Sequence, residues 1–241
     1  MKGIILAAGA GTRLNGAAVK PKCLVEVGGM SLLRRQIRAL RKANINDIVV
    51  VLGFEGQSIK HECDESVHFV ENPNFAQTSS LYSLWLARHH LTDGFVVLNS
   101  DVLFHPQILE DLLQSSFSDA LLISYQGEKN EPLGDEEMKV KVEEDVVVDI
   151  SKEMNPSEAD GENVGIVKFS PSGAKLLIEY MDDLIARGFS KAWAPRAFLE
   201  FALHHRLHAV STRGYPWIEI DFPEDYQRAV NEVCPNIDCH A

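Results

Sequence analysis

An apolar stretch near the start of the chain runs directly into a glycine-rich loop that basic residues follow. Residues 4–8 are apolar, Gly9-Ala10-Gly11-Thr12-Arg13 comes next, and Lys20-Pro21-Lys22 lies a little further on. Glycine lets the backbone come close to an anion, and successive N–H groups can point at it. Arg13 and Lys22 add full positive charges near the same place. The stretch therefore predicts a site for the phosphates of a nucleotide.

The loop departs from two common phosphate-binding motifs. A dinucleotide fingerprint requires a third glycine, but Leu14 follows Arg13, and the G-x-x-x-x-G-K-[ST] pattern of a P-loop is absent. The missing glycine weakens the alternative of a dinucleotide-binding oxidoreductase. Arg13 keeps its charge in a protein, so it suits a polyphosphate partner.

Two aspartates follow apolar stretches that are typical of buried strands. Residues 95–98 lead through Asn99 and Ser100 to Asp101, and residues 217–220 lead to Asp221. A single aspartate in this context is commonly a turn or cap residue. Two of them beside a phosphate loop predict a Mg²⁺ site, because one or two carboxylates usually hold magnesium on a nucleotide. We therefore expect Mg²⁺ as a cofactor, with Asp101 and Asp221 as its ligands.

The elements that position these residues alternate in the first half of the chain. The patterns predict strands at residues 3–7, 47–52, 67–70, 95–98 and 120–125, and helices at about 31–43, 78–90 and 106–114. This rhythm predicts an α/β fold with a mostly parallel central sheet and helices on both faces. Ligands of such sheets bind at the carboxyl ends of the strands, where the glycine loop and Asp101 fall.

The second half is less regular. We expect a hairpin at 138–142 and 146–150, a polar loop at 155–163, strands at 164–169, 207–210 and 217–220, and helices at 171–187, 195–205 and 223–233. One domain over residues 1–241 is the simplest arrangement. Its nucleotide-binding half covers about 1–125, and its acceptor-binding half with the closing strand and helix covers about 126–241.

The overall composition excludes several classes of partner. The chain of 241 residues is 45% hydrophobic and 24% charged, with a formal net charge of −12. These fractions are typical of soluble globular proteins, and the negative charge repels nucleic acid and anionic membranes. The first apolar run is too short for a secretory signal or a membrane span. We expect a cytoplasmic protein that binds neither nucleic acid nor membrane.

These motifs together resemble the signature of the sugar-phosphate nucleotidyltransferases. The resemblance rests on LAAGAGTRL at residues 6–14 with PKCLV at 21–25, and it continues through Asp101, Ile220-Asp221 and PEDY at 223–226. It spans nearly the whole chain. It implies a Rossmann-like fold related to the GT-A enzymes, with a smaller, hairpin-containing part that binds the acceptor.

Three further stretches are similar to the bacterial cytidylyltransferase branch of that family. They are NPNFAQTSSLYSL at residues 72–84, DISK at 149–152 and DGENVGI at 160–166. This branch transfers CMP from CTP to small acceptors such as phosphocholine or 2-aminoethylphosphonate and releases pyrophosphate. The resemblance implies CTP and a phosphate or phosphonate acceptor as partners, and it leaves a homodimer open.

The resemblance also gives roles to individual residues. Catalysis falls to Arg13, Lys22, Asp101 and Asp221. The nucleotide would be bound by Leu6, Ala7, Ala8, Gly9, Gly11, Thr12, Gly53, Thr78, Ser79 and Ser80. The acceptor would be bound by Lys152, Glu162, Trp193, Trp217 and Glu219.

The acceptor itself stays open at this stage. A choline pocket requires several aromatic faces, and Trp193, Tyr215 and Trp217 could supply them, although both tryptophans fit a packing role equally well. A primary amine would need a carboxylate, and Glu162 and Glu219 are available. The absence of an aromatic residue at 131–133 favours a phosphonate or a small phosphoamine over choline.

Two alternative functions remain. One is a sugar 1-phosphate nucleotidyltransferase that uses UTP, dTTP or CTP. The other is a non-catalytic, nucleotide-sensing domain, which the presence of Arg13, Lys22, Asp101 and Asp221 argues against.

Overall fold

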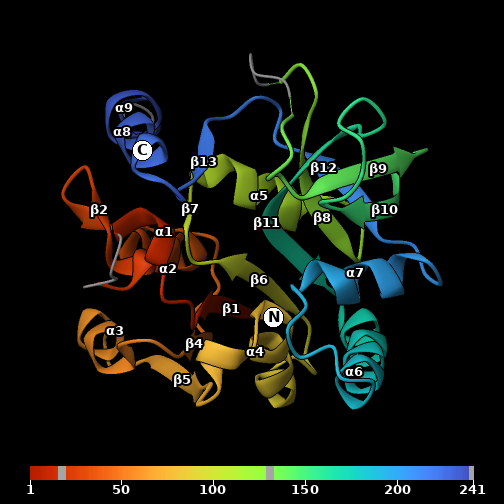
Figure 1. Cartoon of the computed structure of the whole chain (residues 1–241), viewed down its shortest axis with the longest axis horizontal. Coiled ribbons are helices and arrows are strands. Elements are labelled where there is room, and N and C mark those ends of the chain that lie inside the picture. The colour runs from red at the N-terminus through yellow and green to blue at the C-terminus, as the bar shows by residue number, and fades with distance from the viewer. Residues whose placement is uncertain (16–19, 129–132, 239–241) are drawn as a thin grey trace.

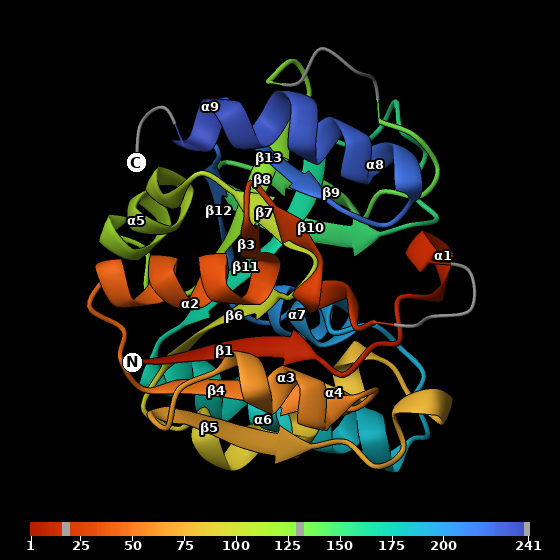
Figure 2. The same ribbon diagram turned by 90° about the vertical axis from the view of Figure 1, so that its left-hand side faces the viewer.

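The computed structural model describes residues 1–15, 20–128 and 133–238, apart from the side chains of Thr12, Asn15 and Asp238. Four parallel strands form one half of its large sheet. β1 (Lys2–Ala7) lies between β4 (Ile48–Leu52) and β6 (Phe95–Asn99), and β5 (Val67–Glu71) forms the edge beside β4. Figure 2 shows β1, β4 and β5 side by side with their carboxyl ends pointing the same way.

The other half of the sheet is largely antiparallel. β11 (Gly161–Phe169) runs antiparallel between β6 and β8 (Ala120–Tyr125), and β12 (His208–Ser211) lies parallel to β8. The hairpin of β10 (Val146–Ser151) and β9 (Lys139–Glu143) closes this edge. β11 is antiparallel to both β6 and β8, so the parallel order of the first half ends at β6. The predicted α/β class and Rossmann-like fold are confirmed, and the sheet is mixed.

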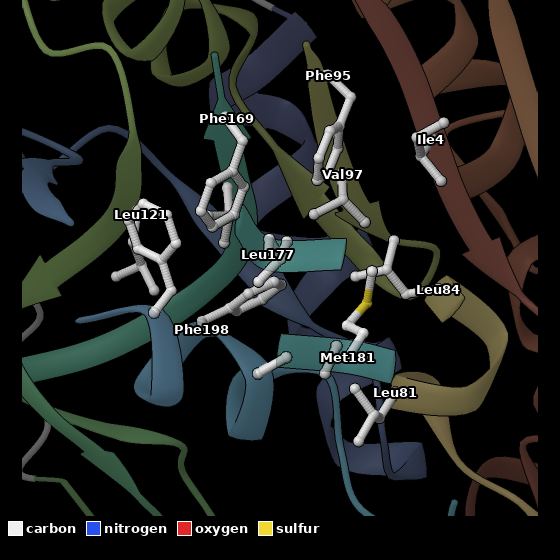
Figure 3. Close-up of a cluster of buried hydrophobic side chains, with 14 of the residues drawn as sticks. Ile4, Leu81, Leu84, Phe95, Val97, Leu121, Phe169, Leu177, Met181 and Phe198 are labelled. Atoms are coloured by element: carbon white, nitrogen blue, oxygen red, sulfur yellow. The ribbon is translucent and has the colours of Figure 1, made fainter. Parts of the chain in front are cut away.

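Helices cover both faces of the sheet. α2 (Leu32–Lys42), α3 (Gly56–Glu62) and α5 (Pro106–Gln114) pack on one face, and α4 (Ser80–Leu86), α6 (Pro171–Ala186) and α7 (Pro195–Ala202) on the other (Figure 1). The alternation of β1 explains this arrangement. Ile4 contributes to the cluster beneath α4, α6 and α7 shown in Figure 3, while Ile5 contributes to the opposite cluster.

A third, smaller core lies beside the sheet. It packs the short pair β2 (Glu26–Val27) and β3 (Met30–Ser31) and the pair β7 (Val102–Phe104) and β13 (Trp217–Glu219) against the last helical segment. That segment runs through α8 (Pro223–Arg228), the π-helical turn η4 (Ala229–Val233) and α9 (Cys234–Asp238). The antiparallel pairing of β7 and β13 joins distant parts of the chain and places the residues that follow β6 beside those that follow β13.

Most predicted elements lie within one or two residues of the observed bounds. The helix predicted at 195–205 ends at Ala202, and the closing helix predicted at 223–233 continues through η4 and α9 to Asp238. The helix predicted at 78–90 is shorter, because it begins after the turn η2 (Phe75–Gln77) and ends before the turn η3 (Arg88–His90). The predicted loop at 155–163 ends earlier, since β11 begins at Gly161. Only glycine fits there, because a Cβ atom would lie 2.3 Å from the Ser124 carbonyl oxygen on β8. In the described part of the chain, none of the helices has the length and apolar character needed to cross a membrane.

Candidate active site

A cleft of about 1080 Å³ opens at the carboxyl ends of the parallel strands. The loop after β1, the loop after β6 and the end of β13 all contribute to its lining. The predicted site residues that line the cleft are Leu6, Ala8, Gly9, Gly11, Arg13, Lys22, Thr78, Ser79, Ser80, Asp101, Lys152, Trp193, Glu219 and Asp221. The position agrees with the edge at which ligands of such sheets bind.

The glycine loop lies at the floor of the cleft and is shaped by two close approaches. Gly11 has a φ of +62°, and a Cβ atom there would lie 2.9 Å from the Cγ atom of Lys22. Gly53 does not line the cleft but lies behind the loop, where a Cβ atom would lie 2.4 Å from the carbonyl oxygen of Ala8. That oxygen accepts a hydrogen bond from the backbone N–H of Phe54 at 3.1 Å. Gly53 therefore supports the loop.

The predicted catalytic residues meet in one network. The Lys22 ammonium, carried by the short turn η1 (Lys22–Leu24), donates to Asp101 Oδ2 at 3.2 Å and also to Asp221 Oδ1. Arg13, on α1 (Thr12–Asn15), donates from Nη2 to Asp221 Oδ2 at 2.7 Å. The backbone N–H of Ile220 donates to the Asp101 carbonyl at 3.0 Å, so the β7–β13 pairing brings the two acids together.

The environment of Lys22 keeps its side chain charged. Burial would lower the pKa of this ammonium, but the negative charges of Asp101 and Asp221 and its hydrogen bonds to both outweigh burial and raise the pKa above its ordinary value. The side chain of Lys22 is only 11% exposed. A fixed positive charge thus lies on the wall of the cleft next to the glycine loop.

Three carboxylates of the cleft also fit a divalent cation. Oxygens of Asp101, Glu219 and Asp221 all lie within 4.8 Å of one another. Asp101 Oδ1 is buried and has no hydrogen-bond partner among the described residues. The surrounding protein and the charges of the two aspartates raise the pKa of Glu219, although this residue is exposed in the open cleft. Hard oxygen donors of this kind suit Mg²⁺.

The start of α4 forms the wall above the glycine loop. Asn72 is buried and donates from Nδ2 to Thr78 Oγ1 at 3.1 Å and to Ser83 Oγ at 3.0 Å. Ser79 donates its backbone N–H to the Ser190 carbonyl at 3.0 Å, and Ser80 Oγ accepts from the backbone N–H of Ala194 at 2.8 Å. These bonds tie the predicted nucleotide wall to the segment 188–194.

Lys152 and Trp193 also line the cleft. The Lys152 ammonium lies 4.9 Å from the centroid of the Trp193 ring and 3.6 Å from Glu136 Oε2. The same Glu136 oxygen lies 3.6 Å from Arg13 Nη1. Glu136 thus lies between two cations of the cleft, Arg13 and Lys152.

Two predicted acceptor residues do not reach the cleft. Glu162 is buried and lies opposite Lys139 in the pairing of β11 with β9. Its neighbour Asn163 lines the cleft instead, because successive side chains of a strand point to opposite faces. Trp217 is 6% exposed and packs in the core beside Tyr215.

Ala7, like Gly53, does not line the cleft, although both were predicted to bind the nucleotide. Ala7 is buried in the core beneath the glycine loop, since its side chain faces the α2 side of the sheet. Thr12 begins α1, and its side chain lies outside the described part of the chain, as do residues 131 and 132 of the stretch that was noted for its lack of aromatic residues.

The cleft contains residues that the sequence patterns did not single out. They include Asn99, Ser100, Asp135, Glu136, Glu153 and Asn163. Asn99 and Ser100 carried a usable signal, because they stand between the end of a predicted strand and Asp101. Glu136 carried none, because it lies in a polar segment without periodicity.

Comparisons with known proteins agree on the kind of enzyme. The chain is 28% identical over 239 residues to a choline-phosphate cytidylyltransferase of Streptococcus pneumoniae, which covers 98% of this chain and 99% of that protein. It is 29% identical over 227 residues to a bifunctional IPC transferase and DIPP synthase of Rubrobacter xylanophilus, covering 92% of this chain but only 49% of that protein.

A solved structure and a family match complete the comparison. An inositol-1-phosphate CTP transferase from T. maritima superposes with a TM-score of 0.79 at 20% sequence identity, over 98% of this chain and 96% of that one. This likeness confirms the fold. Residues 3–143 match the MobA-like NTP transferase domain, which is more than half of the chain. The predicted resemblance to nucleotidyltransferases is therefore confirmed, and the chain belongs to the MobA-like NTP transferase family.

Proposed function

We propose that this enzyme is a cytidylyltransferase that transfers CMP from CTP to a small acceptor bearing a phosphate or phosphonate group. The observation that carries the proposal is that one cleft is lined by the glycine loop, by Lys152 and by the network of Arg13 and Lys22 with the two aspartates. The full-length similarity to a choline-phosphate cytidylyltransferase supports CTP as the nucleotide.

The proposed reaction is a displacement at the α-phosphorus of CTP. An acceptor oxygen forms a bond to that phosphorus, and the bond to the bridging oxygen of pyrophosphate breaks. A phosphate or phosphonate is already ionised at neutral pH, so the reaction requires no catalytic base. The chain's own contribution is then positioning and charge stabilisation.

The cationic side chains divide this work according to their places in the cleft. Arg13 and Lys22 would neutralise the β- and γ-phosphates and the charge on the departing pyrophosphate. Lys152, which also lines the cleft, would hold the phosphoryl group of the acceptor. The backbone of residues 6–11 and the serines at the start of α4 would face the ribose and the base.

We also propose Mg²⁺ as the cofactor, with Asp101 and Asp221 as protein ligands and Glu219 beside them. When bound, the ion would supply positive charge to the phosphate oxygens. The unpartnered Asp101 Oδ1 supports this assignment, because a buried carboxylate oxygen without a donor is costly. Lys22 already bridges both aspartates and would offset part of their mutual repulsion before the ion binds.

A panel of nucleotides and acceptors tests the proposed function. Pyrophosphate release should occur with CTP and a phosphate or phosphonate acceptor, and it should be much slower with UTP, dTTP or ATP. The acceptors are phosphocholine, 2-aminoethylphosphonate, 2-hydroxyethylphosphonate and several sugar 1-phosphates. Release with sugar 1-phosphates alone would overturn the proposal.

That outcome would establish the second candidate, a sugar 1-phosphate nucleotidyltransferase. The feature that favours it is the pair of amides, Asn155 and Asn163, on the acceptor side of a roomy cleft, because amides can bind sugar hydroxyl groups. Such an enzyme would use UTP or dTTP at least as well as CTP in the same panel.

A further inference from the structure

We propose that Glu136 makes this enzyme select an acceptor that carries a primary ammonium group as well as its phosphoryl group. The inference rests on the proposed function and deepens it. The nucleotide end of the cleft is the same for any acceptor, so the residues around Lys152 must make the distinction. Glu136, Lys152 and Trp193 are the described side chains that meet there by direct contact.

An ammonium group, that of Lys152, already lies in a suitable environment at this place. The Lys152 Nζ atom lies 4.9 Å from the centre of the Trp193 ring and 3.6 Å from Glu136 Oε2. An aromatic face and a carboxylate are the two groups that stabilise an ammonium ion most directly. The side chain of Lys152 is 23% exposed, whereas Glu136 is 72% exposed and open to a ligand.

The length of a short acceptor fits the distances around Lys152. If Lys152 holds the phosphoryl group, a two-carbon spacer places an amine at most about 4 Å from the phosphorus, since three single bonds separate the two atoms. That distance is comparable with the separations of Lys152 from Trp193 and Glu136. The amine of such an acceptor can therefore reach the ring and the carboxylate while its phosphoryl group contacts Lys152.

The charges around Glu136 also favour an ammonium group in the acceptor. Glu136 has two cationic neighbours, Arg13 and Lys152, both at 3.6 Å. The proposed function gives both cations to phosphate groups, which would leave the carboxylate beside new negative charge. The described lining of this end also carries Asp135 and Glu153. An acceptor ammonium restores the balance, and an acceptor without one does not.

A primary and a quaternary ammonium group need different surroundings in a binding site. A primary ammonium donates hydrogen bonds to carboxylates, whereas a quaternary one relies on several aromatic faces. Among the described residues at this end, Trp193 is the aromatic side chain that lines the cleft, and Lys152 lies over its ring.

The segment that carries Glu136 is held from beneath by Lys139. This side chain is fully buried, and its ammonium donates to the carbonyl oxygens of Gly134, Asp135 and Glu137 at 3.1, 3.2 and 3.2 Å. The backbone on both sides of Glu136 is therefore fixed. A carboxylate presented on a held segment can discriminate between ligands better than one on a free loop.

The test compares 2-aminoethylphosphonate, 2-hydroxyethylphosphonate and phosphocholine as acceptors with saturating CTP and Mg²⁺ at pH 7.5. We expect kcat/KM of the wild-type protein to favour the amine over the hydroxyl compound by about tenfold or more, as for a charged hydrogen bond. Glu136→Gln should remove most of that preference through the KM of the amine. Glu143→Gln removes an exposed charge from the turn end of the same hairpin and should leave the preference unchanged.

A charge reversal and a binding measurement sharpen the test. Glu136→Lys should weaken the amine further and improve 2-carboxyethylphosphonate. Calorimetry with a CTP analogue that cannot release pyrophosphate should show the same ranking without turnover. Thermal unfolding should be unchanged in each variant, because Glu136 is exposed.

The outcomes separate this inference from the proposed function. Turnover with CTP but with equal use of amine and hydroxyl acceptors, or with a preference that survives in Glu136→Gln, would overturn the inference alone. A preference for phosphocholine over the primary amine would also overturn it. An absence of CTP turnover with every acceptor would overturn the proposed function, and the inference with it.

Discussion

Lys22 connects the two aspartates of the site by hydrogen bonds. Its ammonium lies between Asp101 and Asp221, where a divalent cation would otherwise be the natural counterion of the two acids. The lysine and the cation would therefore compete for the same oxygens. The arrangement predicts opposite effects of Lys22 on metal binding and on turnover.

Replacing Lys22 by Gln should strengthen Mn²⁺ binding by about fivefold or more, because the ammonium no longer competes with the ion for the oxygens of Asp101 and Asp221. The rate of pyrophosphate release should fall, because only Arg13 remains to neutralise the negative charge of the phosphates. Mn²⁺ titration followed by electron paramagnetic resonance measures the first effect. Weaker Mn²⁺ binding in this variant would show that Lys22 does not compete with the cation.

Asp101 provides the second prediction at this scale. Asp101→Asn should lower turnover by about a hundredfold or more, the usual loss when a preorganised charge is removed from an active site. The matched control is Asp93→Asn, which changes an exposed aspartate outside the cleft. Steady-state pyrophosphate release compares the two. Comparable activity of the two variants would contradict the assignment of Asp101.

Among the elements, the glycine loop depends on the strand next to it. Gly53→Ala would place a methyl group 2.4 Å from the Ala8 carbonyl oxygen and 2.7 Å from Phe75 Cβ. We expect a loss of about 1–3 kcal/mol of unfolding free energy, as for overpacking, together with weaker CTP binding. Gly56→Ala is the control, since its Cβ would meet Leu52 at an ordinary 3.4 Å. Urea unfolding and CTP titration of both variants measure the effects.

β11 carries a buried charge that affects stability. Burial lowers the pKa of Lys168, which is 4% exposed and donates to the Ser115 carbonyl at 3.2 Å. A lysine with a lowered folded-state pKa destabilises the fold below that pKa, and the penalty disappears as pH rises towards the ordinary value of 10.5. Lys168→Met should therefore stabilise the protein at pH 7, and less so at pH 9.5.

Urea midpoints at the two pH values measure this difference. Lys175→Met changes an exposed lysine on α6 and serves as the control at both pH values. A Lys168→Met variant that is less stable than the wild type at pH 7 would mean that the hydrogen bond to Ser115 outweighs the cost of burial.

The elements also show what sequence patterns can predict. β1, β4 and β6 are continuous apolar runs that are buried on both faces. The sequence therefore predicted both the strands and the site residues that follow their carboxyl ends. The direction of β11 could not, because it depends on pairings with β6 and β8 that are distant in sequence. Glu162 was misplaced for the same reason, since a face is assigned only once the register is known.

At the scale of the whole molecule, the site draws on both halves of the chain. Arg13 and Lys22 come from the first loop, Lys152 from the segment after β10, and Asp221 from the end of β13. A ligand that bridges these segments stabilises the folded state as a whole. The thermal midpoint therefore reports on substrate binding.

Adding CTP with Mg²⁺ at a hundred times its Kd should stabilise the protein by about 2.7 kcal/mol, which corresponds to about 5–10 °C for a chain of this size. Chelation of the metal should remove most of this shift, because the aspartates would then face the phosphates directly. Differential scanning fluorimetry measures both. An equal shift with and without metal would contradict the proposed Mg²⁺ site.

The hydrogen bond from Ile220 to Asp101 has a consequence for synthesis of the protein. A chain made from its N-terminus presents the glycine loop, Lys22 and Asp101 long before Asp221 leaves the ribosome. Any polypeptide that stops before Asp221 lacks the second aspartate, and a shorter one also lacks β13, which pairs with the strand that follows Asp101. Turnover is therefore reserved for chains whose translation has passed Asp221, and partial products should be inactive even where their first strands fold.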